Sequence, residues 1–346
     1  AGLATKIAGN ISPSLLTVLL DVLQHDCLPE VWVLELSSFQ LFSSYSLQAD
    51  AACILNISQD HLDWHGDMNA YIAAKARIYA AQTVRVLNRD DALVWQFANS
   101  ESMSFSSSAP ERGNGFGLLK EHDMLWLAQA QLEPEDGQRK KKGQALPENL
   151  HITRLMPVDA LKIRGLHNAS NALAALALCR ALGLPLAALL HGLREYQGEA
   201  HRVELIARVA DVEFFDDSKG TNVGATVAAL TGLGSERADR GILLIAGGLG
   251  NGQDFAPLQA VVQRYTRAVF LIGQATGILQ SVLSETDVVI HTCASLPEAV
   301  EMAGNMANAG EVVLLSPACA SFDMFKGYAH RAQVFIESVR ELALAR

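Results

Sequence analysis

Acidic, imidazole and amine side chains follow two apolar runs near the start of the sequence. Glu35 comes directly after Val31–Leu34, and His61 closely follows Ala51–Ile57 within the segment DHLD. Short aliphatic runs of this kind are typical of buried strands in parallel sheets, where ligands gather at the carboxyl ends of the strands. Lys75 lies on the amphipathic segment that comes next. We therefore expect these three side chains to leave adjacent elements towards one edge, as a site for a metal ion or a polyanion.

The segment DDSKGTN, residues Asp216–Asn222, follows a strand-like run and leads into a helix-like one. Small polar residues at such a turn present backbone N–H groups and a lysine to an anion. Lys219 is therefore a candidate for binding phosphate, and Asp217 for binding a ribose hydroxyl or a water molecule. The alternative is an ordinary helix N-cap with exposed charges.

Two further turns share this position after a strand. AGGLGNGQDF (Ala246–Phe255) has glycines that permit close approach of a ligand to the backbone. SPACASFDMF (Ser316–Phe325) offers Ser316, Ser321 and the N–H groups after it as a nest for a carboxylate. Each turn has a plain alternative, a loop of small residues that packs tightly. Three such turns at the carboxyl edge of one sheet favour a binding site.

Three of the charged candidates also have ordinary explanations. His61 could cap a helix or lie in the core, Arg202 could be a surface arginine, and Lys75 could be solvated. The carboxylates near His61 favour a metal site, and oxygen ligands suit Mg²⁺. Arg202, beside His201, could bind a phosphate through two parallel hydrogen bonds.

Charge and cysteine content restrict the class of protein. The 346 residues carry 27 basic and 37 acidic side chains, a net charge of −10, which argues against non-specific binding of nucleic acid. The five cysteines are scattered and never spaced as CxxC, as expected for reduced thiols without structural zinc. No apolar run is long enough for a membrane span and no leader opens the chain, so we expect a cytoplasmic protein. We also expect a monomer.

The order of the expected elements predicts two α/β domains. Residues 1–197 would form an incomplete parallel-sheet domain of the ATPase type, with its N-terminal part missing and an antiparallel meander over Ser100–Ile163. Residues 198–346 would form a doubly wound Rossmann-like domain after a hinge at Gly198–Glu204. Its expected strands are Val212–Phe215, Ile242–Ala246, Ala268–Ile272, Val288–His291 and Val312–Leu315.

Several segments together resemble the Mur ligase family, the ATP-dependent amide ligases of peptidoglycan synthesis. They are ELSSFQL, ILNISQDHLD, AAKARIY, HNASNALAALAL, AHRVE, DDSKGTN and LLSPACASFD. The resemblance spans nearly the whole chain and is weakest over Ser100–Ile163, while DDSKGTN together with SPACAS is quite specific. It implies an enzyme that joins D-glutamate to UDP-N-acetylmuramoyl-L-alanine through an acyl phosphate, using ATP and two Mg²⁺ ions.

The resemblance also implies a role for each matching residue. Glu35 would bind one Mg²⁺ ion, and His61 would hold a second ion together with Lys75 as a carbamylated lysine. A lysine that captures CO₂ becomes an anionic oxygen ligand, which suits a hard cation. The catalytic residues would be Lys75, His61 and Lys219. The contacts would be Asn10 and Ser37 for the muramoyl substrate, Asn168, Asn171, Arg202, Asp217 and Lys219 for the nucleotide, and Thr221, Ser321, Phe322 and Tyr328 for D-glutamate and its surroundings.

Three features depart from the family pattern. The family's UDP-binding domain and its GxxGKS/T turn have no counterpart in the sequence, and without that phosphate cradle ATP would be turned over poorly. Asn251 stands where the family often has a lysine for the glutamate side chain. Phe322 and Tyr328 replace residues usually seen as Leu and Phe, which preserves the backbone contacts.

Two other functions are alternatives to the ligase. A truncated homologue that holds nucleotide without catalysis is favoured by the missing GxxGKS/T turn. A nicotinamide-dependent dehydrogenase is suggested by GGLGNG. The dehydrogenase fails because no GxGxxG opens a βαβ unit with an acidic residue about 20 positions further on.

Overall fold

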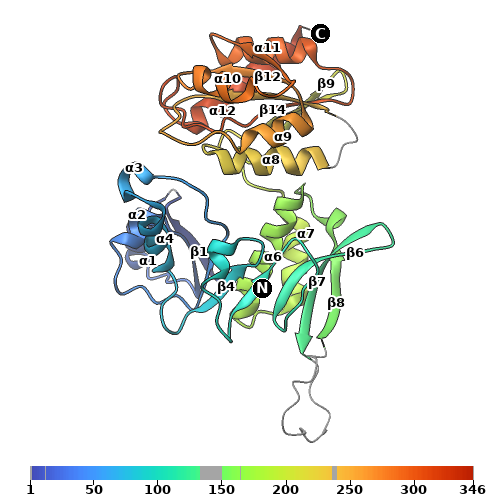
Figure 1. Cartoon of the computed structure of the whole chain (residues 1–346). Helices are drawn as coiled ribbons and strands as arrows, with labels where there is room; N and C mark the ends of the chain where they lie inside the picture. Colours follow the sequence, from blue (N-terminus) through green and yellow to red (C-terminus); the bar gives the residue numbers. More distant parts are fainter. Residues whose placement is uncertain (1, 12, 133–149, 164, 236–239, 346) are drawn as a thin grey trace, which may run out of the picture. The chain divides into compact units, whose positions relative to one another are not determined.

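The computed structural model describes residues 2–345 apart from 12, 133–149, 164 and 236–239. These residues form two compact units (Figure 1). The first comprises residues 1–161 and 169–195, and the second comprises residues 162–168 and 196–346. No helix in the described part of the chain is both long and apolar enough to cross a membrane.

The first unit opens with a small parallel sheet of two strands, β1 (Thr5–Gly9) and β2 (Val31–Glu35). The helix α1 (Leu15–Gln24) packs against this pair through its buried residues Val18 and Val22. The helix begins after Ser14, whose hydroxyl caps the first turn by accepting a hydrogen bond from the Thr17 backbone N–H.

The expectation that Val31–Leu34 forms a fully buried strand is wrong. Ile7 and Val33 are paired in register and are 57% and 49% exposed. Only the face that meets α1 carries a packed cluster among the described residues, so the opposite face of this pair stays open. The second expected strand lies in another sheet, because β3 (Ala51–Ile54) pairs with β4 (Val84–Asn88).

That second sheet has six strands in the order β3-β4-β5-β6-β7-β8. It is parallel from β3 to β6 and antiparallel from β6 to β8, so the expected meander continues the parallel sheet. The part of the expected meander over residues 133–149 lies outside the described residues. The remaining elements of this unit are α2 (Ser38–Phe42), α3 (Leu62–His65), α4 (Met68–Ala76), α5 (Ala92–Trp95), β5 (Met103–Phe105), β6 (Gly115–Glu121), β7 (Met124–Leu132), β8 (Leu150–Pro157), the 3₁₀ helix η1 (Val158–Ala160), most of α6 (Leu166–Ala181) and α7 (Leu186–Glu195).

The second unit, coloured yellow to red in Figure 1, contains a six-stranded sheet in the order β13-β12-β11-β14-β10-β9. Five strands are parallel, and β9 (Glu204–Val209) joins the edge antiparallel to β10. The other elements are β10 (Val212–Asp216), α8 (Val223–Ser235), β11 (Ile242–Gly247), α9 (Leu258–Tyr265), β12 (Thr266–Ile272), α10 (Thr276–Leu283), β13 (Val289–Thr292), α11 (Leu296–Met306), β14 (Val312–Leu315) and α12 (Tyr328–Leu344).

Helices cover both faces of this sheet. One apolar cluster joins α8, α9 and α10 to the sheet, and a second joins α11 and α12 to its other side. Every residue of β11 and β14 is buried, which explains their continuous aliphatic sequences. The α/β class, the parallel sheet with its antiparallel meander and the doubly wound second half are thus confirmed. The antiparallel edge strand β9 was not expected.

Candidate active site

Glu35 ends β2 and is paired with Asn10, which follows β1. The Asn10 amide donates to Glu35 Oε1 at 3.2 Å, and the Asn10 backbone N–H donates to the Glu35 carbonyl. Gly9 makes this approach possible: its φ is +119°, and a Cβ there would lie 2.1 Å from the Glu35 carbonyl oxygen. Both side chains are exposed, so the structure brings a predicted metal ligand and a predicted substrate contact together at an open strand end.

His61 immediately precedes α3 in a left-handed conformation, with φ +53°. Its imidazole is 46% exposed and lies 3.6 Å from an Asp60 carboxylate oxygen. It also contacts the Phe39 ring of α2, with ring centroids 4.7 Å apart. His61 is therefore a surface histidine beside an acidic and an aromatic neighbour, and the core alternative is wrong. It occupies the N-cap position of α3, as the capping alternative expects, but its side chain makes no capping hydrogen bond.

Lys75, on α4, is half-buried, with its amine 5.1 Å from the centre of the Tyr71 ring. Burial lowers the pKa of this amine, and the negative charge of Asp60 partly opposes the shift. His65 lies within electrostatic reach of both His61 and Lys75, because each lowers the pKa of its imidazole after the larger effect of burial. The solvated-lysine alternative is therefore wrong for Lys75. In the described residues, no group of three acidic, histidine or cysteine ligands includes Glu35 or His61.

Ser37 has a structural role at the start of α2. Its hydroxyl accepts from the Gln40 N–H at 3.2 Å, while the Gln40 side chain accepts from the Ser37 N–H at 2.9 Å. This reciprocal capping box fixes the turn that follows β2. Contact of Ser37 with a muramoyl substrate stays a prediction.

In the second unit, the DDSKGTN turn follows β10 and is largely buried. Asp217 is 6% exposed, and its Oδ2 accepts a hydrogen bond from Ser316 Oγ at 2.6 Å. Burial raises the pKa of Asp217 to about 7, against the lowering effect of the Ser316 hydrogen bond. The alternative of a helix N-cap with exposed charges is therefore wrong for this aspartate, which ties the first turn to SPACASFDMF.

The residues predicted to contact the acceptor amino acid differ in exposure. Ser321 is 2% exposed, whereas Phe322 is 72% and Tyr328 39% exposed. The Lys219 amine lies 5.8 Å from the centre of the Tyr328 ring. Thr221, on the same turn as Lys219, is half-buried. The structure thus brings Lys219 next to Tyr328, within one unit.

The predicted nucleotide contacts outside this turn are more open. Arg202 and Asn171 are exposed, and Asn168 is half-buried. Asn251 lies in the glycine-rich turn after β11, is exposed, and has a left-handed backbone with φ +48°. Their ligand contacts stay predictions.

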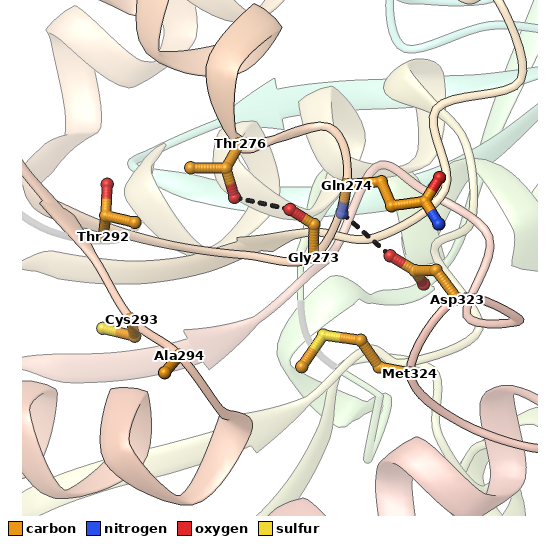
Figure 2. Close-up of a pocket in the computed structure, with 8 residues that line it drawn as sticks. All are labelled: Gly273, Gln274, Thr276, Thr292, Cys293, Ala294, Asp323 and Met324. Carbon is orange, nitrogen blue, oxygen red and sulfur yellow. Dashed lines mark hydrogen bonds between the residues drawn. The ribbon is translucent and has the colours of Figure 1, made fainter.

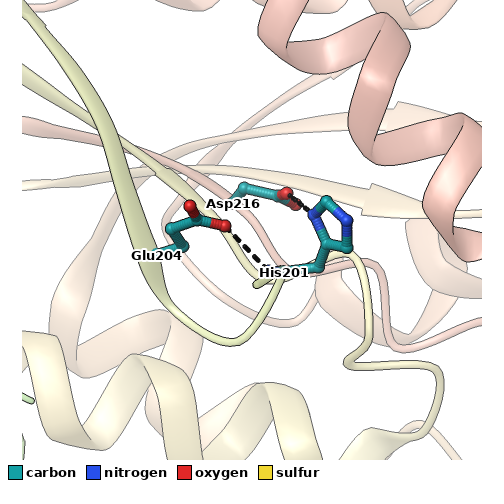
Figure 3. A group of neighbouring side chains, drawn as sticks. All are labelled: His201, Glu204 and Asp216. Carbon is teal, nitrogen blue, oxygen red and sulfur yellow. Dashed lines mark hydrogen bonds and ion pairs between the residues drawn. The ribbon is translucent and has the colours of Figure 1, made fainter. Parts of the chain in front are cut away.

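A cluster that the sequence did not predict lies beside Arg202 (Figure 3). His201, Glu204 and Asp216 place one possible ligand atom each within 4.8 Å of one another. The atoms already bond within the cluster: His201 Nδ1 lies 2.7 Å from Asp216 Oδ2, and the His201 N–H donates to Glu204 at 2.9 Å. Asp216 is fully buried. These contacts fix the segment before β9 against the end of β10.

A second unpredicted feature is an open pocket of about 400 Å³ at the carboxyl ends of β12 and β13 (Figure 2). Asp323 accepts a hydrogen bond from the Gln274 N–H at its rim, at 2.9 Å. None of the predicted site residues lines it. Its lining residues are Gly273, Gln274, Thr276, Thr292, Cys293, Ala294, Asp323 and Met324.

Comparison with known proteins supports the family suggested by the motifs. Residues 7–179 match the Mur ligase middle domain, and residues 201–319 match the Mur ligase glutamate ligase domain. The solved structure of MurF ligase from Thermotoga maritima in complex with ADP shares the fold, with a TM-score of 0.65, 14% identity, and coverage of 99% of this chain and 75% of that one. The fold and the two matches define an α/β ligase of the Mur type.

Curated relatives agree over the whole chain. It is 54% identical over 356 residues to the UDP-N-acetylmuramoylalanine–D-glutamate ligase of Paraburkholderia xenovorans, and 56% identical over 354 residues to the protein of that name from Ralstonia nicotianae. Each comparison covers 100% of this chain and 70% of the relative. The chain belongs to the Mur ligase family.

Proposed function

We propose that this protein is an ATP-dependent ligase that joins D-glutamate to UDP-N-acetylmuramoyl-L-alanine in peptidoglycan synthesis. The observation that carries the proposal is 54–56% identity along the entire chain to two relatives named for that reaction. The substrates are soluble nucleotides and an amino acid, which fits a cytoplasmic monomer. No comparison favours the truncated, non-catalytic alternative.

The proposed reaction must overcome repulsion between two anions. A substrate carboxylate attacks the γ-phosphate of ATP to give an acyl phosphate and ADP, and the amine of D-glutamate then displaces phosphate from that carbonyl. Two anionic groups must approach each other, so cationic side chains and metal ions have to offset the repulsion. In the proposal, Lys219 lies near the phosphates, while Arg202, Asp217, Asn168 and Asn171 contact the rest of the nucleotide.

The open strand end in the first unit is the proposed magnesium site. Glu35 offers a carboxylate that is exposed and bonded to the Asn10 amide, and His61 offers an exposed imidazole. Hard oxygen donors suit Mg²⁺, which supplies charge neutralisation to the phosphates when bound. The Glu35 carboxylate fits one divalent ion, and His61 would hold a second only together with the oxygens of a carbamylated Lys75.

The environment of Lys75 favours carbamylation. Only the neutral form of an amine attacks CO₂, and burial lowers the pKa of Lys75, which increases the neutral fraction at a given pH. The resulting carbamate is an anionic oxygen donor like a carboxylate. Dependence of activity on bicarbonate, lost on removal of CO₂ and restored on its return, is the expected sign.

The acceptor amino acid is assigned to the second unit. Thr221 and Ser321 present hydroxyl groups from two neighbouring turns, with the backbone around Phe322 and the ring of Tyr328 nearby in sequence. Asn10 and Ser37, in the first unit, are assigned to the muramoyl substrate.

The test is phosphate release by the protein as its gene encodes it. Release should require ATP, UDP-N-acetylmuramoyl-L-alanine and D-glutamate together, and should stop when any one is omitted. L-Glutamate in place of D-glutamate is the matched control and should give little release. Nucleotide binding without release under the complete mixture would favour the non-catalytic homologue and overturn the proposal.

A further inference from the structure

Arg331, in the first turn of α12, is a fully buried arginine with 0% of its surface exposed. Its side-chain hydrogen bonds to the described residues all go to neutral oxygens. Nε donates to Ser218 Oγ at 3.0 Å, Nη2 donates to the Ser218 carbonyl at 2.8 Å, and Nη1 donates to the Cys319 carbonyl at 3.1 Å. No ion pair joins it to a carboxylate in the part of the chain that the structure describes. Burial lowers the pKa of the guanidinium to about 10, so it stays charged at neutral pH.

These bonds connect the two turns assigned to the acceptor. Ser218 precedes Lys219 and Thr221 on the DDSKGTN turn, and Cys319 lies two residues before Ser321 on the SPACASFDMF turn. The Ser218 hydroxyl also donates to the Tyr328 carbonyl at 2.8 Å. One planar side chain thus spans both turns, which a lysine with its single ammonium group cannot do.

The third, glycine-rich turn packs against the same point. Leu249 and Ala320 exchange backbone hydrogen bonds of 2.8 and 3.0 Å. Gly248 has φ +134°, and a Cβ there would lie 2.3 Å from the Ala320 carbonyl and 3.4 Å from Arg331 Nη1. The three turns picked out in the sequence therefore meet around one buried cation.

Resting on the proposed function, we infer that Arg331 is a positioning residue for the amino-acid acceptor. It sets the spacing between Thr221 and Ser321 by holding Ser218 and Cys319. The carboxylates of Asp323, Asp216 and Asp217 lie within electrostatic reach of the guanidinium, so its hydrogen bonds to the two turns carry its role.

The test compares Arg331→Lys and Arg331→Met with Arg340→Met, an exposed position on the same helix. Charge-assisted hydrogen bonds are worth about 1.5–3 kcal/mol, so we expect KM for D-glutamate to rise roughly 10- to 100-fold in Arg331→Met. Arg331→Lys keeps the charge and should show a smaller rise. KM for the muramoyl nucleotide, whose proposed contacts lie in the first unit, should not change. Arg340→Met should match wild type throughout.

A purely structural role would give a different result. Variants with lower Tm but unchanged KM for D-glutamate would overturn the inference, provided the wild type is active. If Arg331→Met does not fold, Ser218→Ala decides the matter, because it removes the hydroxyl that joins Arg331 Nε to the Tyr328 carbonyl. It should raise KM for D-glutamate several-fold, and an unchanged KM would contradict us. A wild-type protein without D-glutamate-dependent phosphate release would overturn the proposed function itself, and this inference with it.

Discussion

The open strand end around Glu35 and the buried turns around Arg331 are built in opposite ways. Glu35 and Asn10 at this strand end are exposed, as is His61 before α3, and each has few side-chain partners. Arg331 and Asp217 are buried, and their bonds tie separate turns together. Side chains that bind a strongly charged ligand need acceptor atoms that are free to contact it. Side chains that fix the shape of a site need several hydrogen bonds and packing contacts with their neighbours.

This contrast separates activity from stability. Removing an exposed side chain at the strand end leaves the packing of the first unit unchanged. Removing a buried one in the turns leaves donors or acceptors without partners, which costs folding free energy as well as function. The following predictions can break or sharpen that distinction.

The largest effect is expected for Lys75→Ala. Loss of the carbamate that would hold a Mg²⁺ ion removes charge neutralisation from phosphoryl transfer and should lower kcat by about 100- to 1000-fold. Thermal unfolding should shift little, because the ammonium makes no ion pair in the described structure. Lys120→Ala, at an exposed position of the same unit, is the control. A Lys75→Ala protein with activity within a few-fold of wild type would contradict the assignment.

Asp217→Asn should change how stability depends on pH. The folded-state pKa of Asp217 is raised from 3.8 to about 7, so the native protein binds more protons than the unfolded chain between these values. The contribution of Asp217 to the free energy of unfolding is fully present below about pH 4 and is lost as the pH rises through about 7. This contribution is at most about 4 kcal/mol.

Urea unfolding of wild type and Asp217→Asn between pH 4.5 and 8 measures this difference. The wild type should lose stability relative to the variant as pH increases, because the amide cannot titrate. If the free energy of unfolding changed with pH in the same way for both proteins, Asp217 would not take up a proton in this range.

Tyr79→Phe tests a buried support in the first unit. The Ile54 N–H donates to the Tyr79 hydroxyl at 3.0 Å, within the buried end of β3. Removing the hydroxyl leaves that N–H unpaired and should cost about 1–3 kcal/mol of unfolding free energy, with kcat little changed. Tyr45→Phe, at a residue that is 85% exposed, should cost nothing measurable. Equal stability of the two variants would show that the contrast between exposed and buried groups fails here.

The smallest effect is expected for Asn251→Lys. A cation at this turn should lower KM for D-glutamate a few-fold, and the left-handed backbone should cost about 1 kcal/mol of stability. Asn251→Met has similar length without the charge and should not lower KM. The same KM in both variants would exclude an electrostatic effect at this position.

Local sequence signals were enough to predict the central strands of the second unit. The aliphatic run Val312–Leu315 is a strand with those bounds, and Ile242–Ala246 extends by one residue, because both lie in the centre of a covered sheet. The edge strand β9 was missed because its antiparallel pairing with β10 gives the sequence ELIARV only partial burial.

The candidate site could be predicted only where polar residues follow a strand. Asp217, Lys219 and Ser321 follow this pattern. Arg331 sits in a helix of ordinary composition, and nothing in its neighbours indicates that its guanidinium points inward to bond two turns. Likewise, Val31–Leu34 looks like a covered strand, but only one face of its sheet carries a packed cluster in the described structure.

The most direct test of the account is the position of the divalent ions. Crystals of the protein as its gene encodes it, grown with nucleotide and Mn²⁺, would locate the ions by anomalous scattering. The account predicts peaks bound to Glu35, and to His61 with a carbamylated Lys75. Peaks at His201, Glu204 and Asp216 instead, with Glu35, His61 and Lys75 free of metal, would contradict it.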